Sequence, residues 1–214
     1  MTNGTSQPAA AAPRKKIGFL GCLGVIVILA IAAGLSVAGS YNKLNTLDQD
    51  VRAKWAQVEN AYQRRADLIP NLVETVKGAA NFEQSTYTAV AEARAKVGQV
   101  KLDPSQLNDP EAFAKFQAAQ DELGSAIGRL LVAVEAYPDL KATQNFRDLQ
   151  TQLEGTENRI TVERQRFNES AQAFNTKRMS FPTVLIAGLF GSRFAEKTYF
   201  KAQAGSETAP KVKF

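Results

Sequence analysis

The sequence contains no histidine and only one cysteine, Cys22. Without histidine the chain cannot use Ser-His-Asp or Cys-His catalysis, or a zinc site that combines histidine with cysteine. A lone cysteine cannot form a disulfide within the chain. Glu59, Glu74 and Glu157 offer carboxylates, but metal sites in helical bundles usually include histidine as well. We therefore predict no enzymatic activity, no metal and no cofactor.

One stretch of the chain has no charged residues, and through most of the rest acidic and basic residues are nearly equal in number. The net charge of +5 comes from 26 basic and 21 acidic residues, and the excess lies at the two ends. Residues 1–16 form a short polar and basic N-terminus, and the last residues are again basic. Because acidic and basic side chains nearly balance between residues 41 and 191, we predict no nucleic-acid partner.

Residues 17–40, IGFLGCLGVIVILAIAAGLSVAGS, carry no charge. About 20 apolar residues span a bilayer, so this segment predicts a transmembrane helix in contact with lipid. A cleaved signal peptide ending at Ala38-Gly39-Ser40 is the alternative. The basic residues before the span predict a cytoplasmic N-terminus and an extracytoplasmic remainder, in a single-pass membrane protein.

Apolar residues after the span recur every seven residues, as in the seam of a helical bundle. One stripe runs through Trp55, Tyr62, Ile69, Val76, Glu83, Val90 and Val97, and a second through Val58, Arg65, Leu72 and onwards. Pro70 lies inside this pattern. Either Pro70 kinks one helix over 41–98, or the chain turns at Asp67–Pro70 and a capping pair of Asn71 and Glu74 starts a new helix. The unbroken register favours the kink.

Two further helices and a short apolar segment follow a loop at 98–110. One helix runs from Glu111 to Tyr137, and the next begins near Asp139 with an apolar or aromatic residue every seven positions: Phe146, Leu153, Ile160, Phe167, Phe174 and Phe181. Ser180 and Pro182 suit the start of the segment TVLIAGLFG at 183–191. This segment either caps the bundle, which we favour, or lies in the lipid interface. Residues 192–214 are predicted to be a mobile tail. The fold class is therefore all-α, an antiparallel up-and-down bundle of three to four long helices over 41–191, preceded by a transmembrane helix.

The candidate interaction residues surround the two charged positions of this pattern. Arg65 falls on the seam, where it either pairs with Glu157 or Glu163 across the bundle or extends its guanidinium to water. Asn158, beside Glu157 and Arg159, either bonds across helices or lies on a solvated face, which we favour. Trp55 is expected in the core. The block from Arg64 through Asp67, Pro70 and Asn71 to Glu74 is expected to be a structural joint and a possible docking surface.

Four segments together resemble the LemA family of bacterial membrane-anchored proteins. They are YNKLNTLDQDVRAKWAQVENAYQRRADLIPNLVETVKGAANFE (41–83), EAYPDLKATQNFRDLQTQLEGTENRI (135–160), RFNESAQAFNTKR (166–178) and FPTVLIAGLFG (181–191). The resemblance implies a transmembrane helix followed by a four-helix bundle domain. The fourth helix would come from a break near Pro70 or from the segment after Ser180. The resemblance implies no catalytic residues, and it implies an N-terminus outside the cell, opposite to the charge-based prediction.

The chain has few groups suited to catalysis, long seven-residue apolar stripes and a single predicted transmembrane span. Together these features predict an adaptor or scaffold that acts through helix–helix contacts with protein partners. Two other functions stay open. The chain could assemble as a homo-oligomer that organises or coats the membrane surface, or it could be an extracytoplasmic sensor module.

Overall fold

The computed structural model describes residues 15–79 and 82–202, and all regular structure within them is helical. This confirms the predicted all-α class. The elements are α1 (Lys15–Lys77), α2 (Gln84–Gln99), η1 (Pro104–Gln106), α3 (Pro110–Val134), α4 (Pro138–Lys141), α5 (Gln144–Met179), α6 (Thr183–Leu189) and η2 (Gly191–Phe194). Residues 1–14 and 203–214, which belong to the predicted N-terminus and tail, lie outside the described part.

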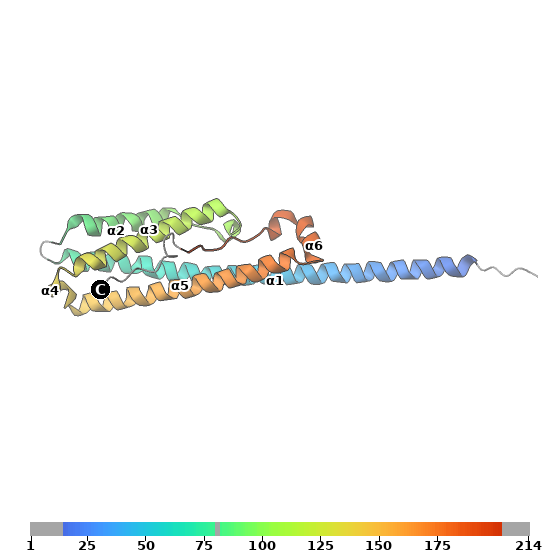
Figure 1. Cartoon of the computed structure of the whole chain (residues 1–214), viewed down its shortest axis with the longest axis horizontal. Coiled ribbons are helices and arrows are strands. Elements are labelled where there is room, and N and C mark those ends of the chain that lie inside the picture. Colours follow the sequence, from blue (N-terminus) through green and yellow to red (C-terminus); the bar gives the residue numbers. More distant parts are fainter. Residues whose placement is uncertain (1–14, 80–81, 203–214) are drawn as a thin grey trace, which may run out of the picture.

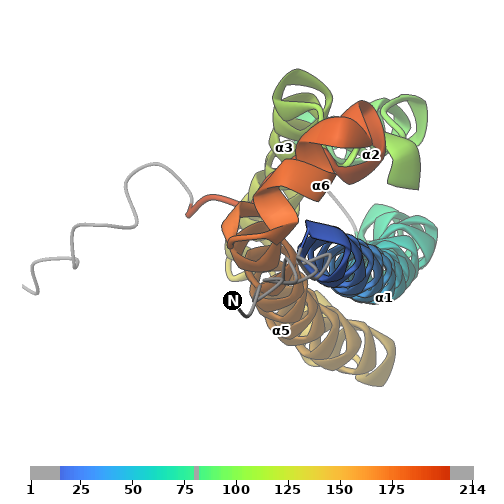
Figure 2. The same ribbon diagram turned by 90° about the vertical axis from the view of Figure 1, so that its right-hand side faces the viewer.

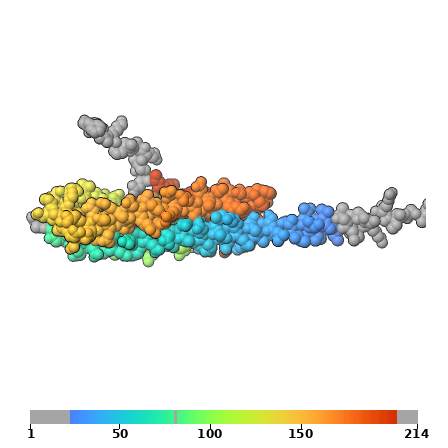
Figure 3. Space-filling model, turned by 90° about the horizontal axis from the view of Figure 1, so that it is seen from below, coloured from blue at the N-terminus to red at the C-terminus, as the bar shows by residue number. Residues whose placement is uncertain are grey.

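Four helices form an antiparallel bundle (Figures 1 and 2). The second half of α1 packs along α5 and α2, and α2 packs along α3. The first half of α1 projects beyond the bundle, with exposed side chains over 23–39 (Figure 3). By length and composition this part of α1 could cross a membrane.

The chain reverses after Lys77, which contradicts the predicted single helix over 41–98. It also runs as one helix through Pro70, so the alternative turn at Asp67–Pro70, with Asn71 and Glu74 as caps, is wrong. Gly78, a weak helix former, follows the end of α1, and α2 returns antiparallel. The reversal buries Val90 and Ala93 against the same core as Val76, which explains why the seven-residue pattern persists across it. The fourth helix of the bundle is therefore α2.

The ends of the later helices follow local capping chemistry. Asp109 accepts hydrogen bonds from two backbone N–H groups at the start of α3, and Pro110 occupies its first position. The Thr143 hydroxyl accepts from the N–H of Phe146 at the start of α5. Ser180, predicted to begin the segment after α5, is instead the C-cap residue of α5. Phe181, predicted as the last residue of the aromatic stripe, lies beyond α5 and is 80% exposed.

The buried side chains form two cores along the rod. The core nearer the apolar half of α1 includes Trp55, Phe113, Phe167 and Phe174. The other core lies towards α4 and includes Ile69, Leu123, Phe146 and Leu153. The burial of Trp55 in the core nearer the apolar half of α1 confirms that Trp55 is a core residue. Between the two cores, α1 places the buried Arg65 in the bundle interior.

The packed part of the chain extends beyond residue 191, where the sequence analysis placed its end. Phe194, Lys197 and Phe200 are all buried. Phe200 contacts the rings of Trp55, Phe113 and Phe167. Residues 192–202 are thus part of the bundle rather than a tail, because their aromatic side chains complete its core.

Candidate functional site

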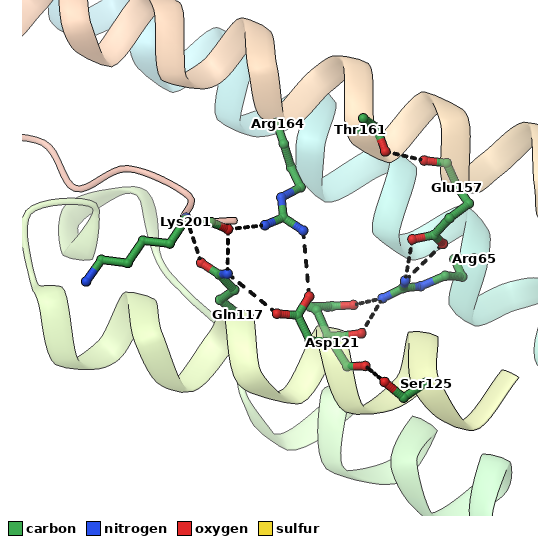
Figure 4. Close-up of polar contacts among 9 residues, drawn as sticks. Arg65, Gln117, Asp121, Ser125, Glu157, Thr161, Arg164 and Lys201 are labelled. Atoms are coloured by element: carbon green, nitrogen blue, oxygen red, sulfur yellow. Dashed lines mark hydrogen bonds and ion pairs between the residues drawn. The ribbon is translucent and has the colours of Figure 1, made fainter. Parts of the chain in front are cut away.

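A polar layer crosses the bundle at Arg65, whose side chain is only 3% exposed. Nη1 of Arg65 donates to both carboxylate oxygens of Glu157 on α5, at 3.3 and 3.1 Å. Nη2 donates to the carbonyl and to the side-chain oxygen of Gln120 on α3, at 2.9 and 2.6 Å. Figure 4 shows the Arg65 guanidinium facing the Glu157 carboxylate. Of the two partners predicted for Arg65, the structure has Glu157.

Two neighbours shape the space around the guanidinium. Its carbon lies 5.1 Å from the centre of the Tyr62 ring, and burial raises the pKa of Tyr62 to about 12, so that phenol stays neutral. On the α3 side, a Cβ at Gly124 would lie 3.4 Å from Nη1 of Arg65. Gly124 therefore lies against the guanidinium, and a Cβ here would make an ordinary van der Waals contact with it.

The extended segment after Ala195 is held by three side-chain amides. Each donates to one backbone carbonyl and accepts from the N–H of the same residue. Asn175 holds Lys197 in this way, with both distances 2.9 Å. Asn168 holds Phe200 at 3.1 and 2.9 Å, and Gln117 holds Lys201 at 3.0 and 3.2 Å. The segment thus binds α3 and α5 through its backbone, as an added strand would bind a sheet.

Arg164 joins this segment to α3 beside the polar layer (Figure 4). Its Nη2 donates to the carbonyl of Lys201 at 3.1 Å, and its Nη1 lies 3.6 Å from Asp121 on α3. Its guanidinium also lies over the ring of Phe200, at 4.6 Å from the centroid. Asp121 is the sequence neighbour of Gln120, so the polar layer and the contacts of the C-terminal segment adjoin each other on α3, and together we call them the polar network.

A buried ion pair holds the N-terminal part of the extended segment against α1. The Lys197 ammonium lies 2.7 Å from Oδ1 of Asp48 on α1, and Nε of Arg52 lies 2.9 Å from Oδ2. Burial alone would raise the pKa of Asp48, but hydrogen bonds and the positive charges of Lys197 and Arg52 outweigh it and hold the pKa below its usual value. Both members of the Asp48–Lys197 pair are almost completely buried.

The other predicted residues lie on the surface. Asp67 accepts from Gln63 at 2.7 Å, Glu74 pairs with Lys77 at 3.0 Å, and Arg159 pairs with the buried Glu163 at 2.8 Å. The exposed residues of the predicted set are Arg64, Asp67, Pro70, Asn71, Glu74, Glu157, Asn158 and Arg159. Arg64 and Arg159 come together, because both line one groove between α1 and α5. Asn158 lies on the solvated face that we favoured.

Sequence reasoning missed the side-chain amides of the network. These amides are neutral and polar, so their residue types alone do not distinguish them from ordinary surface residues. They are Gln117, Gln120, Asn168 and Asn175. The seven-residue spacing of Asn168 and Asn175 was the one available signal, since it places both on one face of α5. Chemically, the side chains of the polar network can bind the backbone of a polypeptide segment and pair buried positive charges with carboxylates. Within the described residues, no three Cys, Asp or Glu side chains gather as metal ligands.

Comparison with known proteins places this architecture in a family. The chain is 27% identical to magnetosome protein MamQ 2 of Paramagnetospirillum magneticum, over 86% of the chain and 73% of that protein. It is also 27% identical to magnetosome protein MamQ of Magnetospirillum gryphiswaldense, over 87% and 74%. Protein LemA of Metamycoplasma hominis is 24% identical over 70% of the chain and 64% of that protein. None of these names denotes an enzyme. Residues 54–214 match the LemA family model, so the chain belongs to the LemA family.

Proposed function

We propose that this protein is a non-enzymatic, membrane-anchored adaptor that holds an acidic segment of a partner protein in the groove between α1 and α5. The apolar segment 17–40 would anchor it in the inner membrane of a bacterium, and the charge distribution favours an extracytoplasmic bundle. The observation that carries the proposal is the charge of the groove.

The groove is positive and rich in hydrogen-bonding groups. Its lining includes two arginines, Arg64 and Arg159, and no carboxylate. Arg64 is exposed and forms no ion pair with any of the described residues, so its charge is available to a partner. Arg159 is paired with Glu163 but remains 60% exposed.

The remaining lining suits a polypeptide. The amides of Gln57, Asn60 and Gln152 can donate to and accept from a polypeptide backbone. Side-chain amides already bind backbone in this protein, at Lys197, Phe200 and Lys201. An acidic helix or extended peptide therefore matches the groove in charge and in hydrogen bonding.

Site-specific photocrosslinking in cells tests the proposal. A photoreactive amino acid at Asn60, in the groove, should give adducts with a partner protein that disappear when Arg64→Glu and Arg159→Glu reverse its charge. The same amino acid at Lys115, on the exposed surface of α3, is the matched control and should not give those adducts. Adducts at position 60 that persist after charge reversal would contradict an acidic partner.

The same experiment separates the adaptor from its alternative. If the adducts at position 60 consist of this chain crosslinked to itself, the groove is a contact between copies, and the homo-oligomer that organises the membrane surface replaces the adaptor. A reporter fused after Phe214 tests the orientation, since reporter activity in the cytoplasm would contradict an extracytoplasmic bundle.

A further inference from the structure

The short helix α6 lies at the end of the bundle from which the apolar half of α1 emerges (Figure 1). Viewed along the rod, α6 runs across this end of the bundle (Figure 2). The Phe190 ring lies 4.9 Å from that of Tyr41, and Arg193 donates to the side-chain oxygen of Asn45 at 3.1 Å. These contacts fix α6 to α1 just after the apolar segment ends at Ser40.

Both faces of α6 are apolar, although only one is covered. Ile186, Ala187 and Thr183 are buried against the bundle. Leu185 and Leu189, on the opposite face, are 66% and 78% exposed. A helix that is apolar all round is expected to be buried on every side. The uncovered face is therefore a surface whose partner is absent from the bundle itself.

Exposed apolar side chains just before α6 enlarge this surface. Met179 ends α5 and Phe181 follows it, and both are largely exposed. We call the set of Met179, Phe181, Val184, Leu185 and Leu189 the α6 patch. A cluster of large apolar side chains of this kind marks a surface that binds protein or membrane.

The position of the α6 patch relative to the apolar half of α1 favours a membrane over a protein as its partner. Tyr41 and Asn45, which contact Phe190 and Arg193, lie within five residues of Ser40, or about 8 Å at 1.5 Å per residue. The headgroup region on each side of a bilayer is about 5–8 Å thick. If 17–40 spans the bilayer, the part of the fold that touches Tyr41 and Asn45 lies at headgroup depth. Lys43 and Arg193 are exposed there and can meet lipid phosphates.

We propose that the α6 patch inserts into the headgroup–acyl boundary of the same bilayer that α1 crosses. This proposal rests on the anchoring of α1 that forms part of the proposed function. The lipid surface thereby covers the free face of α6, as it covers the apolar face of other interfacial helices. Two attachments, one span and one interfacial helix, then fix the tilt of the bundle on the membrane.

Spin-label accessibility in the full chain tests this. The background is Cys22→Ser, and the chain is reconstituted in vesicles of phosphatidylcholine with a minor fraction of phosphatidylglycerol. A nitroxide attached after Leu185→Cys should be relaxed more by oxygen, which concentrates in lipid, than by a water-soluble nickel chelate. A nitroxide after Val132→Cys, exposed at the far end of α3, should show the reverse order.

A third label distinguishes this inference from the anchor on which it rests. After Leu29→Cys, within the apolar segment, oxygen should dominate strongly. A lipid-exposed label at 29 with a water-exposed label at 185 would overturn the α6 proposal alone, and water exposure at both positions would overturn the anchor as well. A label at 185 that is shielded from both relaxants, with spin–spin broadening, would show that a second copy covers the patch, and would also overturn the proposal.

Discussion

The guanidinium of Arg94 on α2 donates a hydrogen bond from Nε to the backbone carbonyl of Ala66 on α1, at 3.0 Å. In an uninterrupted helix this carbonyl would accept from the N–H of the residue four positions later. That residue is Pro70, which has no N–H. Proline therefore exposes an acceptor in the middle of α1, and Arg94 uses it to tie α2 to α1.

Replacing the proline should stabilise the isolated helix and weaken this tie. Pro70 is exposed, and proline is about 3 kcal/mol less favourable than alanine inside a helix. We expect Pro70→Ala to raise the free energy of unfolding by about 1–3 kcal/mol, since the new N–H can bond to Ala66. The thermal midpoint, followed by circular dichroism of the detergent-solubilised chain, should rise by roughly 2–4 °C per kcal/mol.

A double-mutant cycle checks the cause. Arg94→Ala should cost the wild-type chain about 0.5–1.5 kcal/mol, the usual value of one hydrogen bond. The same change should cost less in the Pro70→Ala chain, where the carbonyl already has a donor. Equal costs in both backgrounds would show that the Arg94 bond does not depend on the proline.

The polar layer at Arg65 should depend more on its neutral partner than on its charged one. Gln120 is buried and offers Arg65 two acceptors, whereas the Glu157 side chain is 54% exposed. We expect Gln120→Leu to destabilise by about 1–3 kcal/mol, because it removes a bond to a buried cation. Glu157→Gln should cost about 0–1 kcal/mol, as water and the new amide oxygen can replace the carboxylate.

Comparison of the two variants by thermal melting under one set of conditions decides which partner matters. Asn158→Ala, an exposed change beside Glu157, is the control and should leave the midpoint within error. If Glu157→Gln proves the more damaging variant, the ion pair rather than the glutamine maintains the layer.

The sequence predicted the buried faces of the helices better than their connections. Val76 and Val90 lie on one seven-residue stripe, and the structure buries both. The chain reverses between them, yet the stripe keeps its register, so periodicity alone could not reveal the turn at Gly78. Arg65 could be singled out because a charge on an apolar seam requires a partner. Its second partner, Gln120, carried no comparable signal.

The C-terminal segment was missed for a different reason. Residues 195–202 have no helical or strand periodicity, because the segment is extended and is bound by side chains rather than by neighbouring strands. Only the aromatic residues Tyr199 and Phe200 indicated that the segment belongs to the core. Isolated apolar residues near a chain end are too common to support such a prediction.

Phe200→Ala should be strongly destabilising. The ring is buried among Trp55, Phe113 and Phe167, and its removal leaves a cavity in the core. We expect a loss of about 3–5 kcal/mol. Phe181→Ala is the matched control: the same change at an 80% exposed ring should alter the thermal midpoint of the detergent-solubilised chain very little. Similar losses in the two variants would contradict the packing of the segment.

The Asp48–Lys197 pair should make stability depend on pH in the acidic range. The pKa of Asp48 is held below its usual value, so the folded chain keeps this carboxylate ionised at pH values where the unfolded chain, with a pKa of about 3.9, takes up a proton. The pair therefore stabilises the fold above about pH 4, and that contribution is lost as the pH falls through the folded-state pKa.

Two variants measure this contribution: Asp48→Asn removes the carboxylate of the pair, and Lys197→Met removes the ammonium group. Each variant should melt well below the wild type at pH 7. Asp48→Asn leaves the nearly buried Lys197 ammonium without a carboxylate, and Lys197→Met leaves the nearly buried Asp48 with Arg52 as its remaining cationic partner. In Asp48→Asn the gap to the wild type should narrow as the pH falls below about 4, since the wild type then protonates Asp48 and loses the same interaction. In Lys197→Met the gap should narrow too, because protonation of Asp48 removes the Lys197 ion pair from the wild type and neutralises the carboxylate that lacks Lys197 in the variant. A gap that stays constant between pH 7 and pH 3 in both variants would mean that the pair contributes through packing alone, and that its charges are irrelevant to the stability of the fold.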